Sequence, residues 1–254
     1  MGIYNCENTL VEALDSLESQ SFKDFEIILC EDGSSDHTFE VAKEYSLLHK
    51  NVVLLKNDQN RGLNYSLNRC LEVAKGEYIA RMDGDDISLP NRFEKQVAFL
   101  DAHPEISIVS SVMEYFDEDG TFKVGKAIPY PSPKDVAKNT PFCHAPCMIR
   151  KSAYDAVGGY TVSDSLIRIE DYHLWFKLYI KGYRGYNFNE PLYRMRDDRK
   201  AKKRRKLKNR FRLAKMKIWG IRELGLPFYY NIYSLRGIIV GLLPTFIYNY
   251  FHRR

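Results

Sequence analysis

The 254-residue chain contains no Cys-x-x-Cys motif, and this absence argues against a protein built on disulfides or on a cysteine-rich zinc site. Its cysteines are odd in number and scattered: Cys6, Cys30, Cys70, Cys143 and Cys147. Such spacing argues against a disulfide framework and favours a reducing compartment. His144 lies between the last two cysteines, but no second ligand pair with usable spacing accompanies it, so we do not predict a zinc site there.

Acidic residues are almost absent from the last part of the chain. Residues 199–254 hold sixteen Lys and Arg and a single acid, whereas residues 1–198 hold 22 basic and 32 acidic residues. The net charge of +5 therefore combines an acidic body, residues 1–198, with a basic tail, residues 199–254. A tail of this kind is attracted to anionic lipid, nucleic acid or another protein.

The tail also lacks an apolar run long enough to span a membrane. Twelve of the nineteen residues from Arg199 to Lys217 are basic, and apolar side chains are interleaved at helical spacing. The apolar run from Gly237 to Phe251 is interrupted by Pro244 and is shorter than the roughly twenty residues of one span. We therefore expect a basic amphipathic helix on an anionic membrane surface. Packing on the body and a dimer interface are the alternatives. Nucleic acid is not an expected partner, because no reading module accompanies the charge.

Strand and helix patterns alternate through the first hundred residues. The spacing of apolar residues predicts helices over 8–20, 38–49, 63–74 and 91–102, and strands over 25–30, 52–55 and 78–80. Alternation of this kind predicts right-handed crossovers and a parallel sheet. A hairpin around residues 117–120 and several prolines then indicate a mixed or antiparallel region, followed by helices over 153–157 and 171–180. The expected class is α/β, with a mixed, mainly parallel sheet flanked by helices.

The chain opens on what reads as the end of a strand. Residues 1–5 run into a loop, and no full apolar strand stands before them. An α/β protein normally opens with a complete strand, so we expect the first strand to be truncated.

Two acidic loops follow predicted strands. The run EDGSSD occupies residues 31–36, and the run DGDD occupies residues 83–86. In an open α/β sheet, ligands bind at the carboxyl ends of the strands. Crowded carboxylates are tolerated when they are solvated or bridged by a divalent cation, and Mg²⁺ or Mn²⁺ prefers such oxygen ligands and also holds a pyrophosphate. The alternative interpretation is a pair of ordinary acidic turns.

An ordered set of short motifs resembles the family-2 glycosyltransferases of the GT-A fold. Over roughly residues 1–196 the motifs are, in order, Tyr4-Asn5, residues 31–36, residues 60–62 (NRG), residues 76–86 (GEYIARMDGDD), residues 158–160 (GGY) and residues 170–175 (EDYHLW). The resemblance implies an inverting transfer of a sugar from a nucleotide-diphosphate donor, most often a UDP-sugar. A saccharide or lipid-linked acceptor in cell-surface polysaccharide synthesis would receive it.

The resemblance implies roles at the donor site. Asp32 would accept a hydrogen bond from the nucleotide base, and Tyr4 would lie near that base. Asn5 and Glu31 belong to the same two motifs and are candidate donor-binding residues. Arg61 and Arg81 are candidates for binding phosphate, with a solvated or ion-paired arginine as the alternative for each.

The metal signature of the family matches Asp83 and Asp85. Asp83 would contact the ribose or diphosphate and share the metal site, and Asp85 would bind Mn²⁺ or Mg²⁺. Many relatives carry a histidine shortly after a Tyr-Arg pair, where this chain has Arg196. Either Arg196 contacts the diphosphate, or Asp197 or Asp198 is a ligand, or water completes the shell. His144 is a more distant candidate.

Asp171 matches the catalytic base of the family, with Glu170 as the second candidate. An acceptor hydroxyl must lose its proton as it attacks the anomeric carbon, and a carboxylate within reach can take that proton. Trp175 lies one helical turn beyond Asp171. It either stacks on an acceptor sugar or belongs to the core.

Two other functions compete with this interpretation. A nucleotidyltransferase would need a glycine-rich phosphate loop with basic residues near the start, and the chain has none. A membrane-associated scaffold with a decayed site would not need the intact acidic motifs. We therefore expect an enzyme that is cytoplasmic and peripheral at the inner face of the cell membrane. The sequence does not indicate the oligomeric state.

Overall fold

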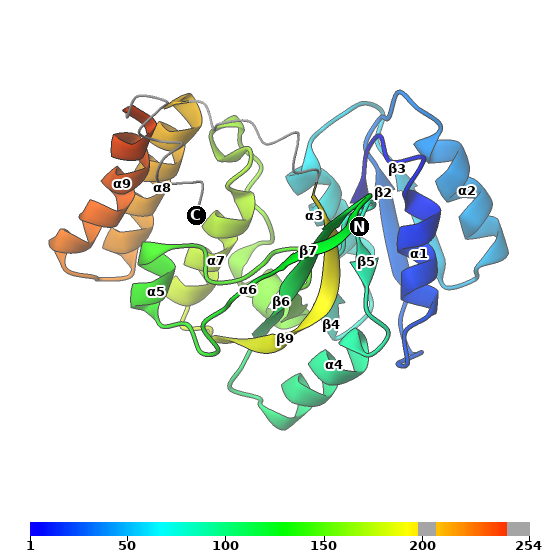
Figure 1. The fold of residues 1–254 in the computed structure, drawn as a ribbon, viewed down its shortest axis with the longest axis horizontal. Helices are drawn as coiled ribbons and strands as arrows, with labels where there is room; N and C mark the ends of the chain where they lie inside the picture. Colours follow the sequence, from blue (N-terminus) through cyan, green and yellow to red (C-terminus); the bar gives the residue numbers. More distant parts are fainter. Residues whose placement is uncertain (198–206, 243–254) are drawn as a thin grey trace.

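The computed structural model describes residues 1–197 and 207–242. The first half of the body forms a parallel sheet of three strands in the order β1-β2-β3. These strands are β1 (Gly2–Ile3), β2 (Ile27–Glu31) and β3 (Val52–Lys56). The helices that connect and follow them are α1 (Leu10–Glu18), α2 (Thr38–Leu48) and α3 (Leu63–Val73). Figure 1 places α1 and α2 at one end of the molecule.

The second sheet is mixed and has the strand order β4-β8-β6-β9-β5, with β7 paired to β6. Its strands are β4 (Tyr78–Ala80), β5 (Ile87–Ser88), β6 (Ile108–Asp117), β7 (Gly120–Val124), β8 (Met148–Arg150) and β9 (Gly185–Arg196). Strands β6 and β9 run parallel, and the other neighbours in this sheet are antiparallel. The predicted α/β class, with a parallel sheet flanked by helices, is confirmed.

The remaining helices of the described residues continue from the body into the tail. They are α4 (Arg92–Ala102), α5 (Pro133–Lys138), α6 (Lys151–Val157), α7 (Glu170–Ile180), α8 (Leu207–Glu223) and α9 (Ile232–Leu242), with short 3₁₀ turns η1 (Asp164–Leu166) and η3 (Phe228–Asn231). Figure 1 shows α8 and α9 at the end of the molecule opposite α1 and α2. Among the helices of the described residues, none is both long and apolar enough to cross a membrane.

Helix α8 packs on the body through a close contact with α7. Gly220 lies against the fully buried ring of Phe176, and a Cβ on that glycine would lie 2.2 Å from the ring. Trp219 stacks on His173 at 4.9 Å between ring centroids. Lys217 is 4% exposed and donates to the carbonyls of Lys138 and Tyr233. The described part of the tail thus uses one of its predicted surface lysines as an internal contact.

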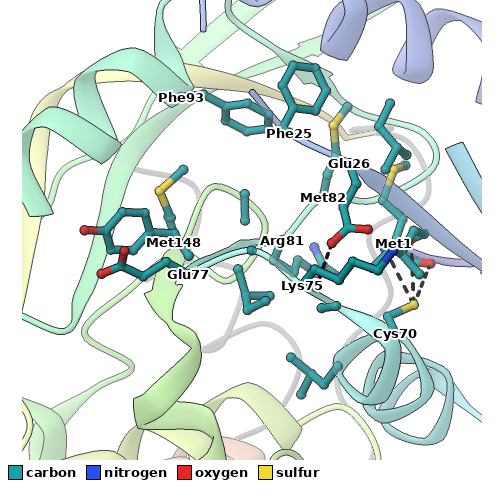
Figure 2. Close-up of a pocket in the computed structure, with 18 of the residues that line it drawn as sticks. Met1, Phe25, Glu26, Cys70, Lys75, Glu77, Arg81, Met82, Phe93 and Met148 are labelled. Carbon is teal, nitrogen blue, oxygen red and sulfur yellow. Dashed lines mark hydrogen bonds between the residues drawn. The ribbon is translucent and has the colours of Figure 1, made fainter. Parts of the chain in front are cut away.

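A cavity of about 810 Å³ lies between β2 and β4, where the two sheets approach each other (Figure 2). Phe25, Met82 and Phe93 contribute apolar side chains to its wall. Strand β1 has two residues, so the edges of β2 and β4 that face the cavity are not bridged along their whole length. The Met1 amino group reaches into this region and donates to the carbonyl of Ile28 at 2.6 Å.

Candidate active site

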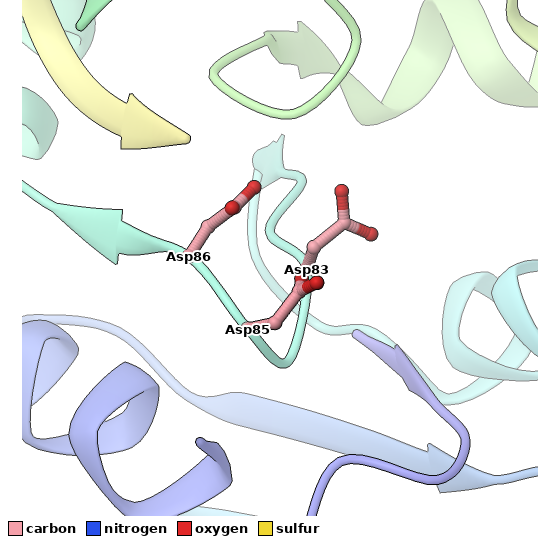
Figure 3. Close-up of side chains that lie close together, drawn as sticks. All are labelled: Asp83, Asp85 and Asp86. Atoms are coloured by element: carbon pink, nitrogen blue, oxygen red, sulfur yellow. The ribbon is translucent and has the colours of Figure 1, made fainter. Parts of the chain in front are cut away.

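The acidic run at residues 83–86 forms the loop between β4 and β5 (Figure 3). One ligand oxygen from each of Asp83, Asp85 and Asp86 lies within 4.8 Å of the others. Asp85 is exposed and Asp86 is buried, so the cluster extends from the surface into the protein. The family resemblance implied Asp83 and Asp85 as the metal pair, and the structure brings a third carboxylate, that of Asp86, close to them.

The carboxylates of this cluster destabilise one another's charge. Burial, followed by the charges of Asp83 and Asp85, raises the pKa of Asp86 to about 7. Burial and the charge of Asp83 also raise the pKa of Asp85. Because a raised pKa means that the ionised form is disfavoured, a cation bound among these oxygens would relieve the repulsion. A set of carboxylate oxygens at this spacing fits a divalent ion such as Mg²⁺ or Mn²⁺.

Arg81 supports the cluster from its buried side. Its guanidinium pairs with Asp83 and is 6% exposed. Burial alone would lower the pKa of Arg81, but the carboxylate of Asp83 outweighs this effect and raises it. Tyr193 is also buried, and its hydroxyl oxygen accepts the Asp83 main-chain N–H at 3.2 Å. For Arg81 the structure therefore describes an ion-paired arginine.

A pocket of about 380 Å³ opens directly onto the cluster. The residues that line it come from the β1–α1 segment, from the acidic loop and from the end of β9, and include Tyr4, Asn5, Asp83, Asp85 and Arg196. The larger cavity between β2 and β4 is not lined by the carboxylates of the cluster. We therefore place the candidate active site in the smaller pocket.

The loops around this pocket are fastened to one another by side-chain hydrogen bonds. Asn5 has a φ of +49° and accepts the main-chain N–H of Ser35 at 2.9 Å, while its own N–H donates to the Ser34 hydroxyl at 3.1 Å. Glu31 is buried and accepts the N–H of Ser34 at 2.5 Å. Of the predicted donor-binding residues, Asn5 thus joins the two loops, Glu31 fastens the second loop to itself, and Tyr4 is exposed.

Asp32 is buried and organises a third loop. Its Oδ1 accepts the N–H of Arg61 and its Oδ2 accepts the N–H of Gly62, both at 2.8 Å. The side chain of Asn57 donates to Oδ1 at 2.6 Å. Arg61 itself is exposed and lies over the ring of Tyr65, with the guanidinium carbon 4.8 Å from the ring centroid. The predicted contact of Asp32 with a nucleotide base stays a prediction. Oδ1 already accepts two hydrogen bonds, whereas Oδ2 accepts one and keeps acceptor capacity for a further donor.

The predicted base residues occupy the first turn of α7. Glu170 is partly buried with a raised pKa caused mainly by burial. The charge of Asp171 acts on Cys143 and Tyr160, which places that carboxylate near both side chains. Tyr160 is held in turn by His144, whose Nε2 lies 2.7 Å from the tyrosine hydroxyl. A role as base stays a prediction for either acid.

The position of Tyr160 depends on a residue that the motif analysis missed. Asn68 accepts the Tyr160 N–H and donates to its carbonyl, both at 2.8 Å. Gly159 has a φ of +60°, and a Cβ there would lie 2.6 Å from Asn68. The absence of a side chain at Gly159 therefore lets α3 pack closely against the segment that precedes α7. No signal in the sequence links residues 92 positions apart in this way.

Trp175 requires a correction. It has no exposed surface, and its ring packs edge-on against Phe142 at 5.2 Å and His144 at 6.0 Å. A sugar can stack only on an accessible ring face. The burial of Trp175 therefore contradicts the predicted acceptor contact in this structure and places the ring in the core.

The residues considered for completing the metal shell lie in different surroundings. Arg196, at the position where the resemblance led us to expect a histidine, lines the candidate pocket. Asp197 donates its main-chain N–H to the carbonyl of Phe116, and Asp198 lies outside the described residues.

The five cysteines are free, and burial raises the pKa of Cys143 to about 11 and that of Cys147 to about 12.

A pocket at the carboxyl ends of β1 and β9, next to an acidic cluster, is the arrangement expected of a sugar-nucleotide transferase. The model of the glycosyl transferase family 2 matches residues 1–158 of the chain. The protein therefore belongs to glycosyl transferase family 2 and is a glycosyltransferase.

Two bacterial relatives are similar to this chain over most of its length. EpsE of Bacillus subtilis (strain 168) is 43% identical over 256 residues, which covers 100% of this chain and 92% of EpsE. The amylovoran biosynthesis glycosyltransferase AmsE of Erwinia amylovora is 32% identical over 203 residues, which covers 77% of this chain and 74% of AmsE. The similarity to AmsE associates the family of this chain with polysaccharide biosynthesis.

Solved structures show the same fold. TarS of S. aureus, residues 1–349 in complex with UDP-GlcNAc, superposes with a TM-score of 0.73 over 94% of this chain and 70% of that chain, at 17% identity. The mannosyltransferase PcManGT of Pyrobaculum calidifontis, in complex with GDP-Man and Mn²⁺, has a TM-score of 0.64 over 95% of this chain and 72% of that chain, at 20% identity. At these identities the likeness concerns the fold.

Proposed function

We propose that this glycosyltransferase transfers a sugar from a nucleoside-diphosphate donor to a saccharide or lipid-linked acceptor, with inversion at the anomeric carbon, in cell-surface polysaccharide synthesis. The observation that carries the proposal is the convergence of three carboxylates within 4.8 Å at the mouth of a pocket bordered by Tyr4 and Asn5. A UDP-sugar is the donor that we favour.

Asp83, Asp85 and Asp86 are the residues that would hold Mn²⁺ or Mg²⁺. When bound, such an ion neutralises charge on the diphosphate that leaves the sugar. The chain's own part is to keep these oxygens in place. Arg81 holds Asp83, and the Arg196 main-chain N–H holds Oδ1 of Asp86 at 2.8 Å. This support removes the cost of ordering the carboxylates when the ion binds.

Asp32 and Asp171 complete the proposed chemistry. Asp32 accepts a hydrogen bond from the base of the donor and keeps the loop at Arg61 and Gly62 in register. Asp171 removes the proton of the acceptor hydroxyl as that oxygen attacks the anomeric carbon from the face opposite the diphosphate. The partly buried Glu170, with its raised pKa, is the second candidate for this proton transfer.

The proposed location is the cytoplasmic surface of an anionic membrane, and α9 supports it. Its exposed apolar side chains, with those of η3, are Phe228, Tyr229, Ile232, Leu235, Ile239 and Leu242. We call this set the apolar face. Exposed cations accompany it: Arg236 lies on α9 itself, and Lys208, Lys215 and Arg222 lie on the preceding helix α8. Apolar groups beside cations suit the headgroup region of an anionic bilayer, and a lipid-linked acceptor resides there.

A donor screen tests the proposal. The protein is incubated with UDP- and GDP-sugars and Mn²⁺ or Mg²⁺, and the released nucleotide is identified. Release of a nucleoside diphosphate that is lost in Asp85→Asn, with unchanged thermal stability of the apoprotein, is the expected result. Release of pyrophosphate would identify a nucleotidyltransferase instead. Metal-dependent release that is unchanged in Asp85→Asn would refute the assignment of the metal site.

A further inference from the structure

Arg196 is the one Lys or Arg side chain among the described residues that line the candidate pocket. It is the last residue of β9, and its Nε donates to the carbonyl of Asp85, whereas the buried Arg81 pairs with Asp83. The side chain of Arg196 is 33% exposed, whereas that of Arg81 is 6% exposed. Of the two arginines beside the cluster, Arg196 is therefore the one that a ligand in the pocket can reach.

Three contacts fix the base of the Arg196 side chain. Its main-chain N–H donates to Oδ1 of Asp86 at 2.8 Å, and its Nε donates to the carbonyl of Asp85 at 3.0 Å. Its guanidinium carbon lies 4.6 Å from the centroid of the Phe116 ring. These three contacts use the main-chain N–H, Nε and the flat face of the guanidinium. The two terminal nitrogens therefore stay available for other partners.

The terminal nitrogens have one partner, and it is an exposed one. Nη2 donates to Oε2 of Glu12 at 2.5 Å, and the Glu12 side chain is 54% exposed. Among the described residues, Nη1 makes no hydrogen bond. An ion pair this accessible to water contributes little stability, so a more highly charged ligand can displace Glu12 at low cost.

We propose that Arg196 leaves Glu12 when the donor enters and binds its diphosphate with the terminal guanidinium nitrogens. The inference rests on the proposed function, since it takes a nucleoside diphosphate as the ligand. A guanidinium presents paired N–H groups that match phosphate oxygens, which an imidazole does not. Arg196 would thus supply by direct contact a part of the diphosphate binding that the metal ion would otherwise have to supply.

Charge balance favours the same assignment. The cluster presents three carboxylates, of which Arg81 neutralises one, and a nucleoside diphosphate sugar adds about two negative charges, whereas a divalent ion returns two positive ones. A cation held at the pocket reduces the remaining excess of negative charge. Glu12 holds that cation in the free protein and so competes with the donor for it.

Calorimetric titration of UDP and of GDP tests the inference on the full chain, in EDTA and in Mn²⁺. The variants are Arg196→Gln, Arg196→His and Glu12→Gln. Arg194→Gln is the matched control, because Arg194 lies over the same Phe116 ring at 4.5 Å and does not line the pocket. Circular dichroism confirms that each variant is folded.

We expect Arg196→Gln to weaken nucleotide binding about tenfold or more, with the larger effect in EDTA. Arg196→His should recover binding in Mn²⁺ but not in EDTA, and Glu12→Gln should tighten binding several-fold. Equal affinity of wild type and Arg196→Gln under both conditions would overturn the inference and leave the proposed function standing. A wild-type protein that binds neither nucleotide with Mn²⁺ would refute both.

Discussion

Arg81 and Asp83 form an ion pair on the buried side of the acidic cluster, and this pair leaves the outer face of Asp83 open to the pocket. The buried arginine neutralises one carboxylate of three. It does so without entering the space that a donor would occupy. The cluster therefore combines a permanent counter-charge inside the protein with an open side for a mobile cation.

Replacement of Arg81 by Gln should destabilise the apoprotein. Asp83 loses its partner and the cluster gains net negative charge, so we expect the free energy of unfolding to fall by about 1–3 kcal/mol. Mn²⁺ should restore part of the loss, because ligand binding stabilises the folded state. Urea denaturation with and without Mn²⁺ measures both effects. The control is Arg61→Gln at an exposed arginine, which should change stability by no more than about 0.5 kcal/mol. Equal losses in the two variants would contradict the prediction.

Replacement of Asp171 by Asn should separate binding from transfer. The amide cannot accept a proton from the acceptor, so we expect transfer to fall by about 100-fold or more while the donor affinity stays unchanged. Product formation and calorimetric donor titration give the two values. Glu170→Gln is the comparison. If Glu170→Gln abolishes transfer and Asp171→Asn does not, the assignments of the two acids are reversed.

The apolar face of η3 and α9 should govern membrane binding. We expect the triple variant Phe228→Ser/Ile232→Ser/Ile239→Ser to lose most of its sedimentation with phosphatidylglycerol vesicles, because exposed apolar area anchors an interfacial helix. The matched control is Leu47→Ser/Leu48→Ser, at two leucines of α2 that are 77% and 79% exposed at the other end of the molecule. Equal retention of both variants on the vesicles would refute the proposed surface.

The contact between α7 and α8 should not accept a larger residue at Gly220. A methyl group there meets the buried ring of Phe176, so we expect Gly220→Ala to lower the free energy of unfolding by about 1–3 kcal/mol. Gly237→Ala in α9 is the control: no atom lies within 4 Å of its added methyl group, and the better helix propensity of alanine should stabilise by up to about 1 kcal/mol. Thermal denaturation compares the two. A neutral Gly220→Ala would show that α8 moves away without cost.

Stability should fall in mild acid because of His173. Burial, and then the charge of Lys177, lowers its pKa from 6.5 to about 4 in the folded protein. The unfolded chain therefore binds the proton first, so the contribution is complete above about pH 6.5 and is lost as the pH falls toward 4. At about pH 5 the expected loss is on the order of 1–2 kcal/mol.

His173→Phe tests this acid sensitivity, because phenylalanine keeps a ring against Trp219 and does not titrate. The variant should lose less stability than the wild type between about pH 7 and pH 5 in urea denaturation. His144 also has a lowered pKa from burial, and its contribution should persist in the variant. Parallel pH profiles for wild type and His173→Phe would argue against the role of His173.

Helices and strands whose apolar residues recur at a regular spacing were predictable from the sequence. The helix predicted over 63–74 is α3 (Leu63–Val73), and the strand predicted over 78–80 is β4. The strand β9 was missed: Pro191 and several polar residues interrupt its alternation, and the structure accommodates Pro191 at a shift in register opposite Val112. Tertiary pairing with β6, which a local pattern does not encode, decides this strand.

The candidate site was predictable where a motif carries several functional residues. The acidic loop and the residues around Asp32 follow from short runs. The contact between Arg196 and Glu12 joins residues 184 positions apart, and the clamp of Asn68 on Tyr160 joins residues 92 apart. Neither leaves a local signal. Trp175 shows that a local pattern can also mislead. An aromatic residue one helical turn from an acid has the same spacing whether its ring faces a ligand or the core.

The position of the Met1 amino group has a practical consequence for protein production. That group donates to Ile28 beside the cavity between β2 and β4, so any residue attached ahead of it must begin inside the cavity. The first residues of an affinity tag fused there would contact the apolar side chains of Phe25 and Met82, which line the cavity. The first residues of a linker would then determine how the two sheets meet, and a bulky or charged linker would push them apart.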